Sequence, residues 1–341
     1  MDHMKVLKRA WHIVWNYRGL WVLGFILALV AAGGGGNGTQ FSSSRAASSP
    51  GGEAIPPEVV GMLVAIGVVL VCVVFILAIV ATVARYVMET ALIRLVDDYE
   101  ETGEKRGVRQ GLRMGWSRTA LRLFLIDLLI DVPVAVVFFL LFLLAAAPLL
   151  LWIIEDEAPR VMGTATTGCL FFLIMLLTIV VSVIVSVLKC FFWRVCALEE
   201  LGVIESIRQG YAVVRQHLQD VAVMQLITTG LELGWSLVLI PIALLLVILG
   251  GVIAAVPALL VGGLASLVFE ETVPWILAAM IGLPVFMLVL AVPMTFLGGL
   301  MKVFQSSTWT LTYRELRALE DQEPARLPEA AAPDLEVAPD A

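Results

Sequence analysis

The sequence predicts an all-α polytopic membrane protein with six transmembrane helices, and three observations lead to that prediction. First, 60% of the 341 residues are hydrophobic and only 15% are charged, whereas soluble domains are about 45–50% apolar and about 25% charged. Second, the apolar residues gather in runs long enough to cross a bilayer, which takes about 20 helical residues. Third, a short motif recurs ahead of pairs of these runs. This composition excludes a soluble globular domain and a disordered chain.

The apolar runs divide the chain into six predicted spans. The ranges are 19–32, 59–83, a span within 121–154, 167–188, a span within 221–261, and 273–301. The first run is short and follows a basic start, so it also fits a secretory signal peptide. Its long aromatic lead-in matches later segments that cannot be signals. We therefore expect it to be the first span.

Lysine and arginine set the expected orientation, because the cytoplasmic segments of membrane proteins carry an excess of them. All but two of the 22 basic residues lie before the first span, near the turns after spans two and four, or after span six. The exceptions are Arg45 and Arg160. We expect a bacterial inner-membrane protein with both termini in the cytoplasm. The stretch around Pro241, Gly250 and Pro257 exceeds what one crossing needs, so a broken or re-entrant segment is expected there.

Composition divides the chain into three parts. Residues 1–18 form a basic and aromatic lead-in, predicted to be amphipathic and cytoplasmic. Residues 19–318 form the membrane domain, within which the glycine- and serine-rich loop 33–58 is expected to be external and flexible. Residues 319–341 form an acidic tail with several prolines, which we expect to be disordered and cytoplasmic.

An internal repeat is the most informative pattern in the sequence. Residues 107–116 (GVRQGLRMGW) align without gaps with residues 202–211 (GVIESIRQGY), and residues 7–11 (LKRAW) form a shorter copy. Each copy contains an apolar, a basic, a small and an aromatic residue. These are Leu7, Lys8, Ala10 and Trp11; Leu112, Arg113, Gly115 and Trp116; and Ile207, Arg208, Gly210 and Tyr211. Each copy precedes two spans, which predicts three parallel units of amphipathic helix, span and span.

The residue types of the motif suit a helix that lies in the cytoplasmic interface. Its aromatic ring would sit at headgroup depth, its basic residue would face anionic lipid, and its small residue would allow close contact with another helix. The even-numbered spans run on into polar extensions at 85–95, 194–201 and 309–316, which we expect to project into the cytoplasm and contact these short helices. Lys189 and Arg194 are expected to extend toward the headgroups.

Several segments together resemble a known group of proteins. They are residues 15–25 (WNYRGLWVLGF) with the glycine-rich tract that follows, residues 194–203 (RVCALEELGV) and residues 308–316 (TWTLTYREL). They resemble bacterial six-span membrane proteins of uncharacterised role, a group similar to the membrane domain of some glycerophosphodiester phosphodiesterases. The resemblance covers residues 1–318 and includes no catalytic motif. It implies a membrane location and this fold, and it implies no activity.

Three acids lie within apolar runs, namely Asp127, Asp131 and Glu232. The two aspartates are four residues apart and so share a helix face. Carboxylates inside a membrane are costly and indicate an ion or proton path by default. In the alternative interpretation the spans begin near Pro133 and Trp235, and the acids lie at the cytoplasmic interface, either exposed or paired with arginine.

The sequence contains no recognisable catalytic, cofactor or metal site. The four cysteines have no CxxC spacing, and the HExxH, GxSxG and GxxxxGK motifs are missing. The leading hypothesis is a non-enzymatic membrane protein that acts as a scaffold, an accessory subunit or a lipid-interacting protein. Its expected partners are membrane lipids and other membrane proteins, not nucleic acid. The alternative hypothesis is a transporter or channel for a small solute or ion, which would use the intramembrane acids. A third hypothesis is a lipid-active enzyme, but the sequence shows no set of catalytic residues for it.

Overall fold

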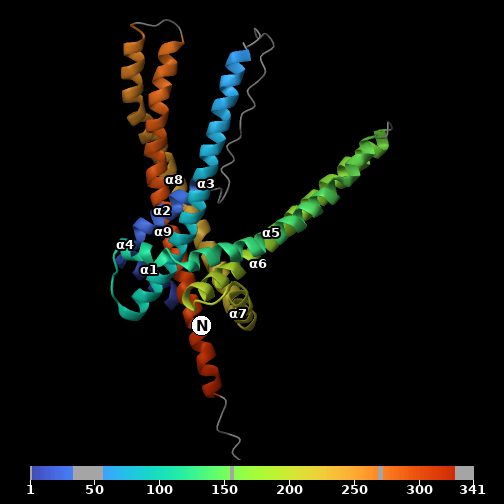
Figure 1. Ribbon diagram of the computed structural model, residues 1–341, viewed down its shortest axis with the longest axis vertical. Helices are drawn as coiled ribbons and strands as arrows, with labels where there is room; N and C mark the ends of the chain where they lie inside the picture. The colour runs from blue at the N-terminus through green and yellow to red at the C-terminus, as the bar shows by residue number, and fades with distance from the viewer. Residues whose placement is uncertain (1, 34–56, 154–156, 268–271, 327–341) are drawn as a thin grey trace, which may run out of the picture.

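The computed structural model describes residues 2–33, 57–153, 157–267 and 272–326 (Figure 1). Within these ranges the secondary structure is entirely helical and contains no strand. Five of the helices are long and apolar enough to cross a membrane, and a bent pair of helices would supply a sixth. The fold is therefore that of an all-α polytopic membrane protein, in which each backbone polar group finds its partner within its own helix.

The element order places a short helix before two further helices three times in succession. The elements are α1 (His3–Asn16), α2 (Gly19–Gly33), α3 (Pro57–Thr102), α4 (Val108–Gly115), α5 (Arg118–Ala146), the 3-10 helix η1 (Ala147–Ile153), α6 (Glu157–Leu198), α7 (Val203–Gln216), α8 (Leu218–Ala265) and α9 (Val273–Arg326). The three short helices α1, α4 and α7 carry the copies of the sequence motif.

The first predicted span corresponds to α2, which has 15 residues and meets α1 at a bend of 95°. At 1.5 Å per residue a helix of this size is about 22 Å long, which is less than the hydrocarbon core of about 30 Å. Helix α2 lies against α9, and the two backbones approach most closely at Gly24 and Gly299. A Cβ atom built on Gly24 would lie 2.6 Å from the carbonyl oxygen of Gly299, so neither position has room for a side chain.

Helix α8 shows that the expected broken or re-entrant segment was wrong. It runs without interruption for 48 residues from Leu218 to Ala265, with Pro241 and Pro257 inside it. A proline removes only one backbone donor. Because every other backbone group in an apolar environment still needs an internal partner, an unbroken helix remains the favourable conformation.

Helix α9 also differs from expectation, because it continues to Arg326. Residues 319–326 are therefore helical where we expected a disordered tail. A hydrogen bond from Arg317 to Glu320, 3.1 Å long, joins residues one turn apart and supports this extension. The remainder of the tail and residues 34–56 of the expected external loop lie outside the described residues.

Buried side chains gather where the helices converge, and we call this region the hub. It comprises the short helices together with residues 86–96 of α3, 191–197 of α6 and 303–316 of α9. In the most apolar stretch of each long helix, by contrast, only 0% to 11% of the residues are buried. Figure 1 shows α3, the α8–α9 pair and the α5–α6 hairpin extending from the hub, with the α5–α6 hairpin splayed away from the others.

Candidate functional site

The small residue in each copy of the motif lies inside the hub. Ala10 of α1 is fully buried. A Cβ atom added to Gly115 would lie 2.3 Å from the carbonyl oxygen of Val87 in α3, and one added to Gly210 would lie 2.6 Å from the ring of Phe192 in α6. Helix α4 thus contacts α3 and α7 contacts α6, while α1 contacts α9. Helices α4 and α7 therefore each pack on the long helix that precedes them, whereas α1 packs on α9, the last helix.

The basic and aromatic residues of the motif lie on the surface of the hub. The three aromatic side chains and the three cations are exposed, and none of the cations has an ion-pair partner among the described residues. Leu7 and Ile207 are half-buried, whereas Leu112 is exposed. We call the six exposed residues the basic–aromatic belt: Lys8, Trp11, Arg113, Trp116, Arg208 and Tyr211.

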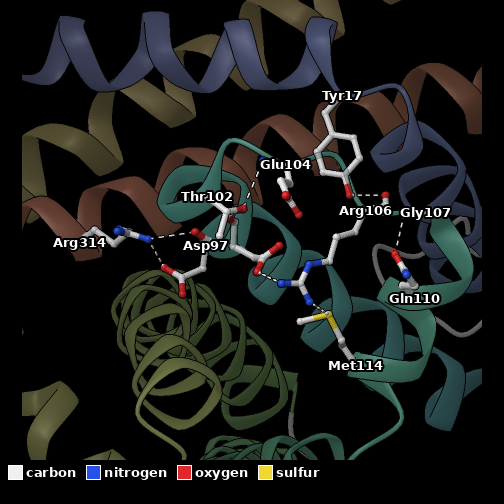
Figure 2. Close-up of polar contacts among 10 residues, drawn as sticks. Tyr17, Asp97, Thr102, Glu104, Arg106, Gly107, Gln110, Met114 and Arg314 are labelled. Atoms are coloured by element: carbon white, nitrogen blue, oxygen red, sulfur yellow. Dashed lines mark hydrogen bonds and ion pairs between the residues drawn. The ribbon is translucent and has the colours of Figure 1, made fainter.

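Ion pairs connect the three long helices of the hub in a cycle. Arg94 of α3 contacts Glu200 at the end of α6 at 2.8 Å. Arg317 of α9 contacts Glu199 at 2.7 Å, and Arg314 of α9 contacts Asp97 of α3 at 2.5 Å (Figure 2). These pairs were not predicted from the sequence. The sequence does contain a signal for them, because the polar extensions of α3, α6 and α9 carry both acidic and basic residues.

Arg194 shows that the expected extension toward the headgroups was wrong for this residue. Its side chain lies in the hub, only 2% exposed, and donates hydrogen bonds to the carbonyl oxygens of Cys190 (2.6 Å) and Ser306 (3.2 Å). Arg194 lies where α6 packs on α9. The carbonyl oxygens of Cys190 on α6 and Ser306 on α9 accept the hydrogen bonds that water or lipid phosphate would accept at a headgroup. Lys189 likewise contacts protein, because it donates to Asp131 at 2.6 Å.

Asp127 and Asp131 lie together on α5, but their partner differs from the arginine expected for an interfacial pair. Asp127 is 6% exposed and accepts hydrogen bonds from Tyr86 (2.7 Å) and Trp193 (3.0 Å). Lys189 of α6 lies 3.4 Å from Asp127 and 2.6 Å from Asp131. The side chain of Asp131 is 56% exposed. The two aspartates therefore join α5 to α3 and α6.

Of Arg118 and Arg122, the two arginines just upstream of the aspartates, Arg122 contacts the end of α6. Arg122 donates to the carbonyl oxygen of Glu200 at 2.7 Å, because α5 passes the end of α6 at that point. Glu232 does not join the aspartates. It lies on α8, where it is exposed and accepts a hydrogen bond from Gln305 of α9. Among the described residues, no group of three or more His, Cys, Asp or Glu side chains could hold a metal ion.

The corner between α1 and α2 is tied to the loop between α3 and α4 (Figure 2). The hydroxyl of Tyr17 donates to the carbonyl oxygen of Arg106 at 2.6 Å, and the guanidinium of Arg106 contacts Asp98 at 2.5 Å. Gln110 accepts a hydrogen bond from the backbone N–H of Gly107 and so holds the start of α4. Burial raises the pKa of Tyr17 above its ordinary value of 10.0. The hydroxyl therefore stays protonated and remains a donor at neutral pH.

Comparisons with known proteins match the chain to one family. A family model described as "Family of unknown function (DUF7544)" matches residues 13–314. The match runs from the end of α1 to the hub segment of α9, and so covers most of the chain. No curated protein and no solved structure matches the chain. The resemblance to the membrane domain of glycerophosphodiester phosphodiesterases stays a prediction.

Proposed function

The chain belongs to the DUF7544 family, and we propose that within it this protein is a non-enzymatic integral protein of the bacterial inner membrane. It acts as a scaffold or accessory subunit and interacts with membrane lipids. Both termini lie in the cytoplasm, and the hub lies on the cytoplasmic side of the membrane. The short helices lie along the cytoplasmic interface as amphipathic elements of three parallel repeats, and the basic–aromatic belt is the working surface.

One observation carries this proposal, namely that the buried core lies apart from the most apolar stretches of the long helices. The hub holds the buried side chains, whereas at most 11% of the residues in the most apolar stretch of each long helix are buried. Apolar faces of this extent are stable only when lipid tails or partner helices cover them. A protein that organises lipids or other membrane proteins presents such faces, and the splayed α5–α6 hairpin adds to them.

The acids support the same proposal. A transporter or channel would use Asp127, Asp131 or Glu232 along a path for its substrate. In this protein Asp127 and Asp131 share Lys189, and Glu232 contacts Gln305 on the neighbouring helix. These contacts connect helices, which is the task of a structural residue.

The belt has the chemistry of a surface that contacts anionic lipid. Its tryptophans and tyrosine are residue types that settle at headgroup depth. Lys8, Arg113 and Arg208 have no acidic partner among the described residues, so their charges are available to phosphate groups. Each such charge near a membrane surface contributes about 1 kcal/mol of attraction to anionic lipid.

The composition of the phospholipid that co-purifies with the protein is the measurement that tests this function. Wild type and a Lys8→Gln/Arg113→Gln/Arg208→Gln variant are extracted with mild detergent from the same bacterial membranes, and their phospholipids are quantified by mass spectrometry. We expect anionic phospholipid to be enriched over the source membrane in the wild type and less so in the variant. A matched variant, Lys5→Gln/Arg109→Gln/Arg215→Gln, removes one exposed cation from each short helix outside the belt and should retain the enrichment.

Two results would contradict the proposal. One is wild-type protein whose lipid matches the composition of the source membrane, because the belt would then exert no preference. The other is uptake of a solute or ion by proteoliposomes that contain the wild-type protein and are compared with empty vesicles. That result would favour the transporter.

A further inference from the structure

Two hollows meet at the corner between α1 and α2. The first, about 570 Å³, lies between this corner and the loop from α3 to α4, and three cations line it: Arg18, Lys105 and Arg106. The second, about 660 Å³, is a mainly apolar groove between α1, α2, α8 and α9, and its lining includes Lys8 and Trp11 of the belt. Trp15 lines both hollows and therefore forms the wall between them.

The first hollow carries positive charge that the described residues do not neutralise. Its lining includes no carboxylate. Arg106 is paired with Asp98 at 2.5 Å, but Arg18 and Lys105 have no ion-pair partner among the described residues. Two unpaired cations in one concave site attract an anion, and the walls of a hollow concentrate their field.

The basic hollow is held in place by contacts that need no ligand. Tyr17 is buried beneath it, and its hydroxyl donates to the carbonyl oxygen of Arg106 at 2.6 Å. A Cβ atom built on Gly19 would lie 3.0 Å from the ring of Tyr17, so the corner closes tightly around this ring. The two sides of the hollow, which lie 89 residues apart in sequence, are therefore fixed relative to each other.

Aromatic side chains form one wall of the apolar groove. The ring of Trp15 lies edge to face with Trp11 at 5.7 Å and with Trp21 at 5.6 Å, and Trp11 meets Phe304 of α9 at 6.0 Å. The indole N–H of Trp21 donates to the carbonyl oxygen of Val14 at 2.6 Å and so fixes that ring. Tryptophan prefers the depth at which lipid tails give way to headgroups. This wall is suited to an acyl chain next to its headgroup.

We propose that one anionic phospholipid occupies both hollows. Its phosphate lies between Arg18 and Lys105, and one acyl chain follows the tryptophan wall past Trp15. The inference rests on the proposed function and adds a defined site and a lipid class to it. A zwitterionic phospholipid offers the same phosphate but brings a cation of its own, so it binds more weakly. Free phosphate would use the basic hollow alone and leave the groove without an occupant.

Native mass spectrometry of the full chain in detergent micelles tests the site. The probes are dioleoyl phosphatidylglycerol, dioleoyl phosphatidylcholine and inorganic phosphate. We expect the wild type to bind one phosphatidylglycerol molecule in preference to phosphatidylcholine. The variant Arg18→Gln/Lys105→Gln should lose about 30-fold in affinity for phosphatidylglycerol, because two surface charges are removed. Its affinity for phosphatidylcholine should fall much less, because the choline cation of that lipid already offsets part of the attraction of its phosphate.

Two further variants separate charge from chain binding. Lys5→Gln/Arg109→Gln removes two exposed cations of α1 and α4 that line neither hollow, and it should bind phosphatidylglycerol as the wild type does. Trp15→Ala should weaken both lipids, because it removes the wall that the chain contacts. Arg18, Lys105 and Trp15 are all exposed, so these substitutions leave the buried core intact.

Each contrary result has a distinct meaning. Equal phosphatidylglycerol affinity in wild type and Arg18→Gln/Lys105→Gln would overturn this site, and the proposed function would stand if anionic lipid still co-purified through the belt. Inorganic phosphate that displaces phosphatidylglycerol at matched concentrations would also overturn it, because the acyl chain would then contribute nothing. Wild-type protein with no lipid enrichment at all would refute the proposed function itself.

Discussion

Two aspartates of α5 share one lysine but differ in burial, and burial decides what each contributes. Asp127 is 6% exposed and also accepts from Tyr86 and Trp193, whereas the side chain of Asp131 is 56% exposed. Removal of a buried partner leaves donors and a charge without compensation and costs about 3–5 kcal/mol. An exposed ion pair contributes about 0–1 kcal/mol.

We therefore expect Asp127→Ala to lower the free energy of unfolding by about 3 kcal/mol, and Asp131→Ala by less than about 1 kcal/mol. Unfolding of the purified protein in detergent micelles, followed by circular dichroism, measures both values. The two variants remove the same chemical group one helical turn apart, so each controls for the other. Equal losses would show that the contacts of Asp127 with Tyr86 and Trp193 do not stabilise the fold.

At this scale the sequence identified unusual residues but not their partners. Asp127, Asp131 and Glu232 stood out because they interrupt apolar runs. Their partners could not be predicted, because Lys189 lies 58 residues beyond Asp131 and Gln305 lies 73 residues beyond Glu232. Arg118 and Arg122 are nearer in sequence, yet Arg122 contacts the end of α6 instead. The expected pairing of the aspartates with arginine rested on closeness in sequence, which did not predict the contacts.

At the scale of elements, the contact between a short helix and a long one depends on the absence of a side chain. Gly115 of α4 faces the backbone of α3, where an added Cβ would lie 2.3 Å from the carbonyl oxygen of Val87 and 2.8 Å from the Cβ of Ala91. Backbone atoms cannot move aside as a flexible side chain can, so α4 must shift. Overpacking of this kind costs about 1–3 kcal/mol.

Gly115→Ala should therefore lower the free energy of unfolding by about 1–3 kcal/mol and increase hydrogen exchange in α4. Gly107→Ala is the matched control at the other end of this helix, because nothing lies within 4 Å of its added Cβ and its φ is −68°. The control should match the wild type in melting temperature and exchange. Indistinguishable behaviour of the two variants would contradict the close contact between α4 and α3.

The elements themselves were largely predictable, because apolar runs of spanning length leave little choice but a helix. The predicted ranges fall within described helices or the adjoining 3-10 helix, apart from residue 154, which lies outside the described residues. Their ends were less predictable. The extensions of α3, α6 and α9 beyond their apolar runs were expected, whereas the continuation of α8 through two prolines and of α9 to Arg326 was not. These outcomes depend on contacts between distant segments, which local sequence does not record.

At the scale of the whole molecule, the hub closes the chain on itself. Helix α1 packs on α9, so the first helix contacts the last, while α4 and α7 pack on α3 and α6. The motif copies predict that the short helices are equivalent units of a repeat, and this stays a prediction. The cycle of ion pairs and the splay of the α5–α6 hairpin could not be predicted, because both depend on the relative orientation of whole helices.

We propose that the hub and the belt lie on the cytoplasmic side of the membrane. Cysteine substitution tests it most directly, with single Trp11→Cys, Trp116→Cys and Tyr211→Cys variants and an Arg45→Cys variant in the loop expected to be external. A membrane-impermeant maleimide is applied to intact spheroplasts and to permeabilised ones, with the wild type as the baseline for its four native cysteines. We predict that the three belt positions react only after permeabilisation and that position 45 reacts without it. Labelling of any belt position in intact spheroplasts would contradict the account.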